Sequence, residues 1–244
     1  MKKQIILVTF LILQAWLMVG CGQIDSDQVD QSEIYTSYIG TYSEESQDMK
    51  VTASLSVGGQ FGSQVWLTDK SSLSVDGRPM DADDDIFNLI QYRYRTTRTS
   101  YDFPDVFRIR YQNEDGMIYE NIIDMPAGVD FWVVDNLNRS SGGTLKWKLR
   151  HYSGKAETLE FMIEDELGKD ITVHPYASGS EGSYYIEPHR LNEFKGSTVR
   201  ISVCRSRYKK SVDAPQAGGS LKSTYCTRKQ SYPLSGSTWE ENLQ

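Results

Sequence analysis

Runs of alternating apolar and polar residues, separated by glycine turns, recur along most of this chain. The clearest run, from Val51 to Val57, is apolar at every second position and ends at Gly58-Gly59. A period of two is that of a half-buried β-strand. Similar runs occupy residues 65–67, 73–75, 107–111, 117–123, 145–149, 159–163, 171–176, 184–186, 199–203 and 221–227. No apolar stripe of helical spacing has a useful length, so the pattern predicts an all-β sandwich or barrel.

A polar, glycine-ended stretch from Asn136 to Gly143 separates two groups of predicted strands. We therefore expect one β-sandwich domain over residues 50–136 and a second over residues 144–233, followed by a flexible tail over residues 234–244. Fifteen tyrosines, eight phenylalanines and five tryptophans supply the side-chain bulk for two cores.

A tryptophan lies on the first predicted strand of the second half. Leu145, Trp147 and Leu149 share one face of this strand, and basic residues alternate with them. Over roughly residues 144–233 this arrangement resembles fibronectin-type-III and immunoglobulin-like modules, while the first half is similar to them in strand number and spacing alone. The resemblance implies two tandem immunoglobulin-like β-sandwich domains.

Residues 1–21 differ in character from the rest of the chain. Two lysines follow Met1, an apolar run extends from Ile5 to Val19, and Gly20-Cys21 closes it. A cationic start, an apolar segment and a small residue before the cut predict a secretory signal peptide over residues 1–20. A membrane span is the alternative, but the apolar run is shorter than the ~20 residues that a spanning helix needs.

The cysteine at the end of this segment resembles the lipobox of bacterial lipoproteins, although Met18 stands where leucine is usual. In that family the peptide is cut before the cysteine and a diacylglycerol is attached to its thiol. The resemblance implies lipidation at Cys21, with membrane lipid as a partner. Gly22 follows, where aspartate often marks inner-membrane retention in enteric bacteria, so the resemblance favours the outer membrane if the source has two membranes.

The stretch after the cysteine is acidic and polar, with Ile24, Val29 and Ile34 scattered through it without a sustained period. Such a composition buries too little apolar area to offset the entropy of ordering it. We therefore expect a lipidated, flexible tether over residues 21–49, with a short helix or strand over residues 34–39 as the alternative.

Two cysteines remain if Cys21 is lipidated. An even remainder in an exported protein predicts a disulfide between Cys204 and Cys226, with two free thiols as the alternative. Both residues fall on the strand faces opposite the apolar sets. This phase favours a bridge between adjacent antiparallel strands.

The net charge of -7 hides an uneven distribution. Between Lys195 and Gln230 there are nine basic residues against Asp213 alone. A basic end on an exported protein is compatible with lipid phosphate or an anionic glycan as a partner, but the alternative, which we favour, is a solvated polar edge. Nucleic acid is not expected as a partner, because no recognisable binding motif is present.

Signals for catalysis and metal binding are sparse. The acidic run from Asp81 to Asp85 supplies the hard oxygens that calcium prefers, but it lacks EF-hand spacing, and adjacent aspartates on a loop usually repel and stay solvated. The histidines, His151, His174 and His189, do not form a close zinc-binding pair. No GxSxG elbow marks a nucleophile. We assign no catalytic residue, no metal site and no cofactor.

Aromatic and basic residues interleave between Tyr92 and Phe103. Such mixtures are enriched in binding patches and can stack on sugar rings. The alternative, which we favour, makes the aromatics sheet core and the arginines their outward neighbours. The residues concerned are Tyr92, Tyr94, Tyr101 and Phe103, with Arg93, Arg95 and Arg98.

These features predict a lipid-anchored lipoprotein of the bacterial cell envelope. We expect it to be a non-enzyme with a binding or structural role toward an envelope protein or glycan. The alternative is a secreted carbohydrate-active or hydrolytic module on the same scaffold, because β-sandwiches host many functions.

Overall fold

The chain folds almost entirely into β-strands, so the predicted all-β class is confirmed. The structure is a computed structural model, and it describes residues 22–84, 90–97, 105–154, 157–210 and 212–236. Within these residues no helix is long and apolar enough to cross a bilayer.

The strands are short to medium in length and follow one another with few helical turns between them. In chain order, the elements are β1 (Gln23–Asp25), η1 (Ser26–Gln28), η2 (Gln31–Glu33), β2 (Ile34–Ser43), β3 (Asp48–Val57), β4 (Ser63–Trp66), β5 (Ser72–Val75), β6 (Arg78–Pro79), β7 (Asp81–Asp84), β8 (Ile90–Thr97), β9 (Val106–Gln112), β10 (Ile118–Asp124), β11 (Val129–Asn138), β12 (Gly142–Leu149), β13 (Glu157–Asp165), β14 (Asp170–Val173), β15 (Glu181–Ile186), α2 (Pro188–Leu191), β16 (Thr198–Lys209), β17 (Gly219–Cys226) and β18 (Gln230–Ser235).

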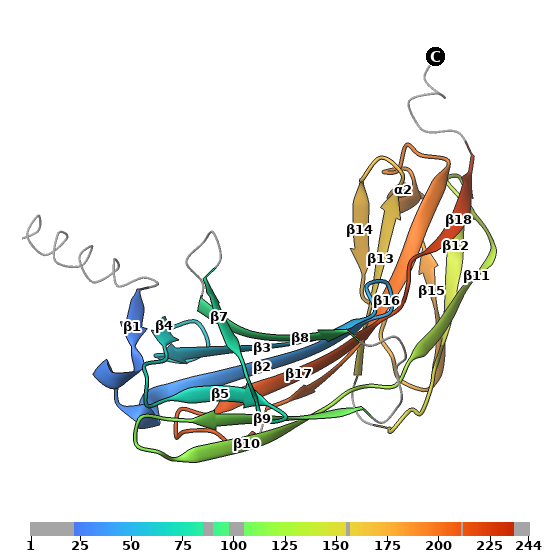
Figure 1. The fold of residues 1–244 in the computed structure, drawn as a ribbon. Helices are drawn as coiled ribbons and strands as arrows, with labels where there is room; N and C mark the ends of the chain where they lie inside the picture. The colour runs from blue at the N-terminus through green and yellow to red at the C-terminus, as the bar shows by residue number, and fades with distance from the viewer. Residues whose placement is uncertain (1–21, 85–89, 98–104, 155–156, 211, 237–244) are drawn as a thin grey trace, which may run out of the picture.

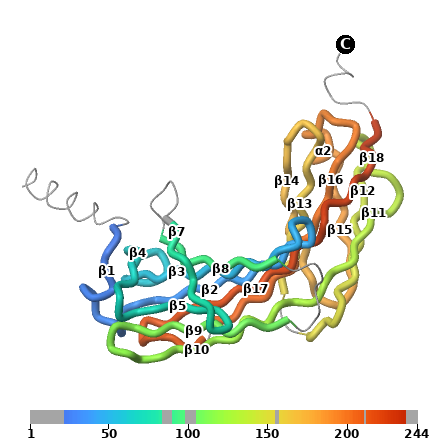
Figure 2. Tube along the Cα trace, in the orientation of Figure 1, coloured from blue at the N-terminus to red at the C-terminus, as the bar shows by residue number. Residues whose placement is uncertain are grey.

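The strands form two lobes that meet at an angle (Figure 1). The first lobe holds β1–β10 and β17, and its small sheet, in the order β10-β9-β5-β6, faces the larger one. The second lobe holds β11–β15, β18 and the short helix α2. Strand β16 belongs to both lobes, because it pairs with β18 over Thr198–Ile201 and with β17 over Cys204–Lys209. We call the junction, where residues 125–128 lead from β10 into β11, the elbow (Figure 2).

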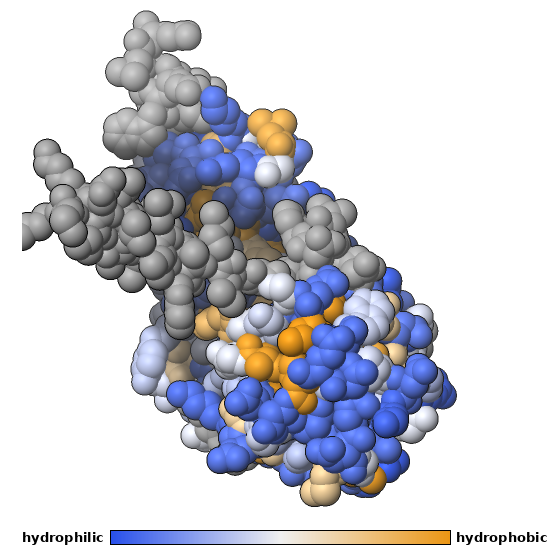
Figure 3. All heavy atoms as spheres, turned by 90° about the vertical axis from the view of Figure 1, so that its left-hand side faces the viewer, coloured by the Kyte–Doolittle hydropathy of each residue, from blue (hydrophilic) through white to orange (hydrophobic). Residues whose placement is uncertain are grey.

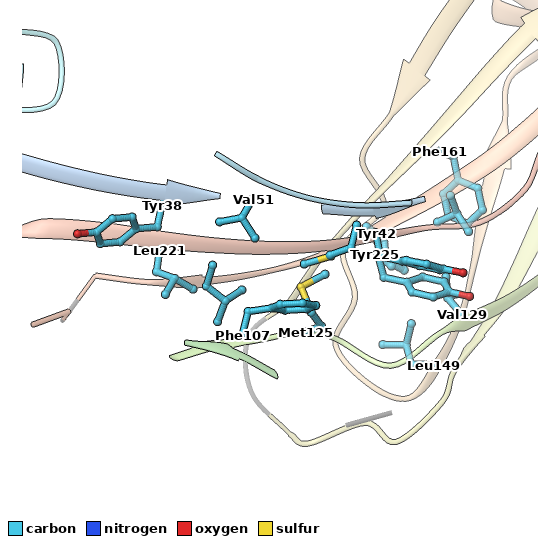
Figure 4. Packing of buried hydrophobic residues seen from close by; sticks show 14 of the residues in the cluster. Tyr38, Tyr42, Val51, Phe107, Met125, Val129, Leu149, Phe161, Leu221 and Tyr225 are labelled. Atoms are coloured by element: carbon cyan, nitrogen blue, oxygen red, sulfur yellow. The ribbon is translucent and has the colours of Figure 1, made fainter. Parts of the chain in front are cut away.

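One hydrophobic cluster runs through both lobes. Figure 4 follows it from Tyr38 and Val51 in the first lobe, past Met125 at the elbow, to Leu149 and Phe161 in the second. The cluster is continuous because β16 belongs to both lobes and carries inward-facing residues along its length.

The predicted inward face of the second half is confirmed. Leu145, Trp147 and Leu149 are at most 3% exposed. The indole of Trp147 packs on Phe161 with 5.8 Å between ring centroids. Gly182 lies opposite on β15, where an added Cβ would come within 2.3 Å of the indole. Glycine is therefore required beside this tryptophan.

The predicted flexible tether over residues 21–49 is wrong for the residues described. Strand β2 lies between β3 and β17, and it pairs with β3 along its whole length and with β17 from Thr36 to Ser43. The alternative of a short strand over residues 34–39 is correct, and the strand extends to Ser43. Ile34, Thr36, Tyr38 and Tyr42 point into the core at a period of two, a pattern that is weak in the sequence because threonine and tyrosine carry much of it. A strand of this kind buries enough surface to offset its ordering entropy.

The predicted domain boundaries do not match the strand pairing. Residues 136–143 form the β11–β12 hairpin inside the second lobe, and Arg139 there is 5% exposed, donating to the carbonyls of Phe194, Gly196 and Gly236. The first lobe also needs β17 from the far end of the chain. The predicted tail begins too early, since Leu234 is buried on β18.

Candidate functional site

The predicted disulfide is confirmed. Cys204 and Cys226 lie directly opposite each other on the antiparallel strands β16 and β17, with 4.1 Å between their Cα atoms. Cys226 also marks the end of the pairing with β2. The bridge therefore links β16 covalently to β17, the strand that pairs with β2 from the amino-terminal part of the chain.

A buried ion cluster lies at the elbow. The side chains of Arg205 and Glu157 are both 0% exposed, and the guanidinium donates to the carboxylate from Nε at 2.9 Å, while its Nη2 lies 2.7 Å from the same oxygen. Its Nη1 donates to the carbonyls of Ala127 at 2.9 Å and Arg150 at 2.6 Å. On the other side of the carboxylate, Arg207 donates from Nε at 2.6 Å. The cluster joins strands of both lobes to the connecting segment.

The solvated polar edge that we expected between Lys195 and Gln230 does not include Arg205, which is buried. The alternation of the strand indicates this burial, because Arg205 continues the inward series of Val199, Ile201 and Val203. Glu157 likewise precedes Leu159 at inward spacing. A buried charge at an inward position requires a partner of opposite sign.

The exposed part of the basic end lines a hollow between β10 and the β16–β17 hairpin. Its volume is about 400 Å³, and Leu221 and Ile122 make its apolar wall. Arg207 and Lys209 bring positive charge, and Asp124 lies 3.6 Å from Arg207. Tyr208 is half-exposed at the same place. The hollow offers stacking, apolar contact and a cationic rim, and its lining residues include no nucleophile paired with a base.

The loop that closes this hairpin is fixed to the body of the protein. Asp213 Oδ2 accepts from the backbone N–H of Glu120, and the Asp213 N–H donates to Asn121 Oδ1, both at 2.8 Å. The N–H of Ala217 donates to the carbonyl of Ser32 at 2.9 Å. The shape of the hollow is thus held from β10 and from η2.

The acidic run that suggested calcium is a strand rather than a loop over Asp81–Asp84. It pairs with β8, and Asp83 forms an ion pair with Arg93. Asp85 lies outside the described residues. Among the residues that the structure describes, no three histidine, cysteine, aspartate or glutamate side chains gather as a metal site.

The three histidines lie on different elements of the fold: His151 follows β12, His174 follows β14, and His189 lies on α2. The Nδ1 of His174 is 3.7 Å from Glu160, and that of His189, on α2, is 3.0 Å from Glu187. His151 follows β12 in a left-handed conformation, with φ of 46°. The pairs of His174 and His189 are exposed surface contacts.

The aromatic and basic stretch is divided between core and surface. Tyr92 is 5% exposed, and its hydroxyl accepts from the N–H of Leu67 at 2.6 Å, as the core interpretation predicts. Arg95 forms an ion pair with Asp48. Tyr101, Phe103 and Arg98 lie outside the described residues.

A polar latch holds the first described residues to the first lobe. The carboxylate of Glu114 accepts from the hydroxyls of Ser26, at 2.5 Å, and Thr68. Ser26 also lies 3.1 Å from the hydroxyl of Ser71. Burial acts to raise the pKa of Glu114, but the hydroxyl donors outweigh it and hold this pKa below its usual range. The latch keeps β1 in place.

Comparison with described protein families finds no family that this chain matches, and comparison with curated proteins finds no match. Cys21, the predicted lipidation site, lies outside the described residues. Its neighbour Gly22 is described, and its carbonyl accepts from the N–H of Gln64 at 3.1 Å.

Proposed function

We propose that this chain is a lipid-anchored protein of the bacterial cell envelope with a non-catalytic binding or structural role. The observation that carries the proposal is the cationic and apolar segment that ends at Gly20-Cys21. The disulfide between Cys204 and Cys226 supports it, because such bridges persist in oxidising compartments outside the cytosol. Gly22, in place of aspartate, favours the outer membrane in a source with two membranes.

The ordered start of the fold determines how the anchor would act. Strand β1 begins at Gln23 and the latch of Ser26 and Glu114 follows. A diacylglycerol on Cys21 would therefore hold the β1 end of the first lobe at the bilayer, with no long tether between them. Acyl chains contribute roughly 0.8 kcal/mol per buried methylene, so two or three chains would give a lasting anchor.

The hollow beside β10 is our candidate contact for an envelope partner. Lys209 and Tyr208 combine positive charge with an exposed ring, a composition common in binding patches, while Arg207 at the same place is already paired with Glu157 and Asp124. An anionic glycan or an acidic protein segment fits this chemistry better than a neutral ligand.

Incorporation of radiolabelled palmitate in a bacterial host tests the anchor. We expect the full-length chain to take up label and Cys21→Ala to lose it. The matched control is Cys226→Ser, which removes a different cysteine and should keep its label. Label that persists in Cys21→Ala would refute lipidation at this residue.

A further inference from the structure

The β3–β4 turn, residues 58–62, carries Phe61 with 91% of the side chain exposed. No other large apolar side chain among the described residues is as exposed. Exposed apolar side chains are common singly on protein surfaces, so the position and rigidity of this one decide what it can do.

The turn holds its shape through glycine. Gly58 and Gly59 have φ of 89° and 94°, which favour glycine over any other residue. An added Cβ on Gly62 would lie 1.8 Å from the carbonyl oxygen of Val57, so the chain closes there without a side chain. The Gly59 carbonyl accepts from Ser56 Oγ at 2.7 Å and from the Gly62 N–H at 3.0 Å. Phe61 is thus presented outward by an ordered turn.

The turn lies next to the start of the fold. Strands β1 and β4 run parallel, with Gln23 beside Gln64, and the Gly22 carbonyl accepts from the N–H of Gln64. Phe61 precedes Gln64 by three residues, so it lies at the end of the pairing where Gln23 begins β1. Cys21 is the residue before Gly22 in the sequence, so the proposed anchor and Phe61 belong to the same end of the first lobe.

The surroundings of the turn suit a lipid surface. No charged residue occurs from Val51 to Thr68. The β9–β10 turn, which Glu114 joins to Ser26, adds Met117, 58% exposed, at the same end of the lobe. Figure 3 looks onto this end and shows apolar side chains gathered among hydrophilic ones.

We propose that Phe61 inserts into the interfacial region of the bilayer and fixes the orientation of the protein on the membrane. The inference rests on the proposed anchor at Cys21, which raises the local concentration of lipid around the turn so that one aromatic side chain suffices. Exposed Asp25 and Asp27 follow on the chain, so the contact is with acyl chains and neutral headgroups rather than with anionic lipid.

The chain offers a direct probe of this contact. In the mature lipidated protein Cys21 is acylated and Cys204 is bridged to Cys226, so an introduced cysteine is the only free thiol. We would label Phe61→Cys with an environment-sensitive fluorophore and reconstitute it into phosphatidylcholine vesicles. The matched control is Leu167→Cys, since Leu167 is 70% exposed on the β13–β14 turn of the second lobe. Gln60→Cys repeats the measurement with Phe61 intact.

We expect the labels at positions 61 and 60 to shift to shorter emission wavelength on reconstitution. Quenching by nitroxide-bearing lipids should be several-fold stronger there than at position 167, and added phosphatidylglycerol should not increase it. Equal quenching at 61 and 167, in protein that floats with the vesicles, would overturn the inference and leave the anchor intact. A shift at 61 already present without vesicles would also overturn it, because another protein surface would then cover the turn. Failure of the protein to float would instead refute the anchor.

Discussion

Replacement of Arg205 by methionine should destabilise the protein severely, because it removes one member of the ion cluster at the elbow. Methionine keeps part of the apolar stem but donates no hydrogen bond. The change takes from Glu157 the two guanidinium nitrogens at 2.9 and 2.7 Å, and it leaves the carbonyls of Ala127 and Arg150 without the Nη1 donor. The Glu157 carboxylate, 0% exposed, cannot turn to solvent instead.

The expected size follows from these contacts. Removing one partner of a buried ion pair costs about 3–5 kcal/mol. Arg207 still donates to Glu157 at 2.6 Å, which reduces the cost, while each carbonyl left without a donor increases it. We therefore expect the free energy of unfolding to fall by about 4 kcal/mol. In a protein of this size that lowers the melting temperature by roughly 8–16 °C.

Urea titration and thermal melting of the mature chain, followed by circular dichroism, measure this loss. The matched control is Arg200→Met on the same strand, where Arg200 donates to Glu164 at 2.8 Å and is 46% exposed. Such a solvated pair contributes less than about 1 kcal/mol. If Arg205→Met and Arg200→Met shift the urea midpoint equally, the buried cluster does not stabilise the elbow and the reasoning fails.

Three further changes test other parts of the structure. Asp165 is 0% exposed, and this burial acts to raise the pKa of its carboxyl group. The backbone N–H groups of residues 167, 169, 195 and 196 donate to the carboxylate, and together they hold its pKa below the usual value. This stabilisation is therefore present above the unfolded pKa of about 3.9 and is lost as pH falls through the lower folded pKa. Asp165→Asn should lower the free energy of unfolding at pH 7 by about 2 kcal/mol and flatten its decline in acid, and an unchanged pH profile would contradict this. Reduction of the Cys204–Cys226 bridge, with a sequence separation of 22, should lower the free energy of unfolding by about 3 kcal/mol in urea titrations, and alkylation of both cysteines without reductant would show that no bridge forms. Ser26→Ala should weaken the latch by about 1–2 kcal/mol and speed proteolysis before β2, whereas Ser46→Ala, at an exposed hydroxyl, should leave the cleavage rate unchanged.

Local patterns in the sequence predicted strands and their inward faces well. Trp147 with its neighbours lies as the period of two requires, and Cys204 pairs with Cys226 across adjacent strands as predicted, although Cys204 is itself buried. The same period of two predicts that Arg205 faces inward. This prediction is lost when every arginine is assumed to lie on the surface. Strand β2 was predicted only as the alternative, over residues 34–39, because its inward positions include Thr36 and Tyr38 rather than an aliphatic series.

The division into domains could not be predicted from local patterns. A polar, glycine-ended stretch indicates a linker or a hairpin turn equally well, and residues 136–143 are the turn. The pairing of β2 with β17 leaves no local trace at all, since it depends on residues far apart in the chain. The same holds for the contact of Glu114 with Ser26.

The parallel pairing of β2 with β17 also determines when the first lobe can close. Ser37 and Ser220 meet across this pairing with a sequence separation of 183. Pairing segments so far apart in sequence slows folding, and it cannot happen before β17 (Gly219–Cys226) has been synthesised. Until β17 arrives, β2 keeps an unpaired edge and the core beneath it stays open. The amino-terminal lobe is therefore among the last parts to mature, and a chain cut before Gly219 should stay unfolded at both ends.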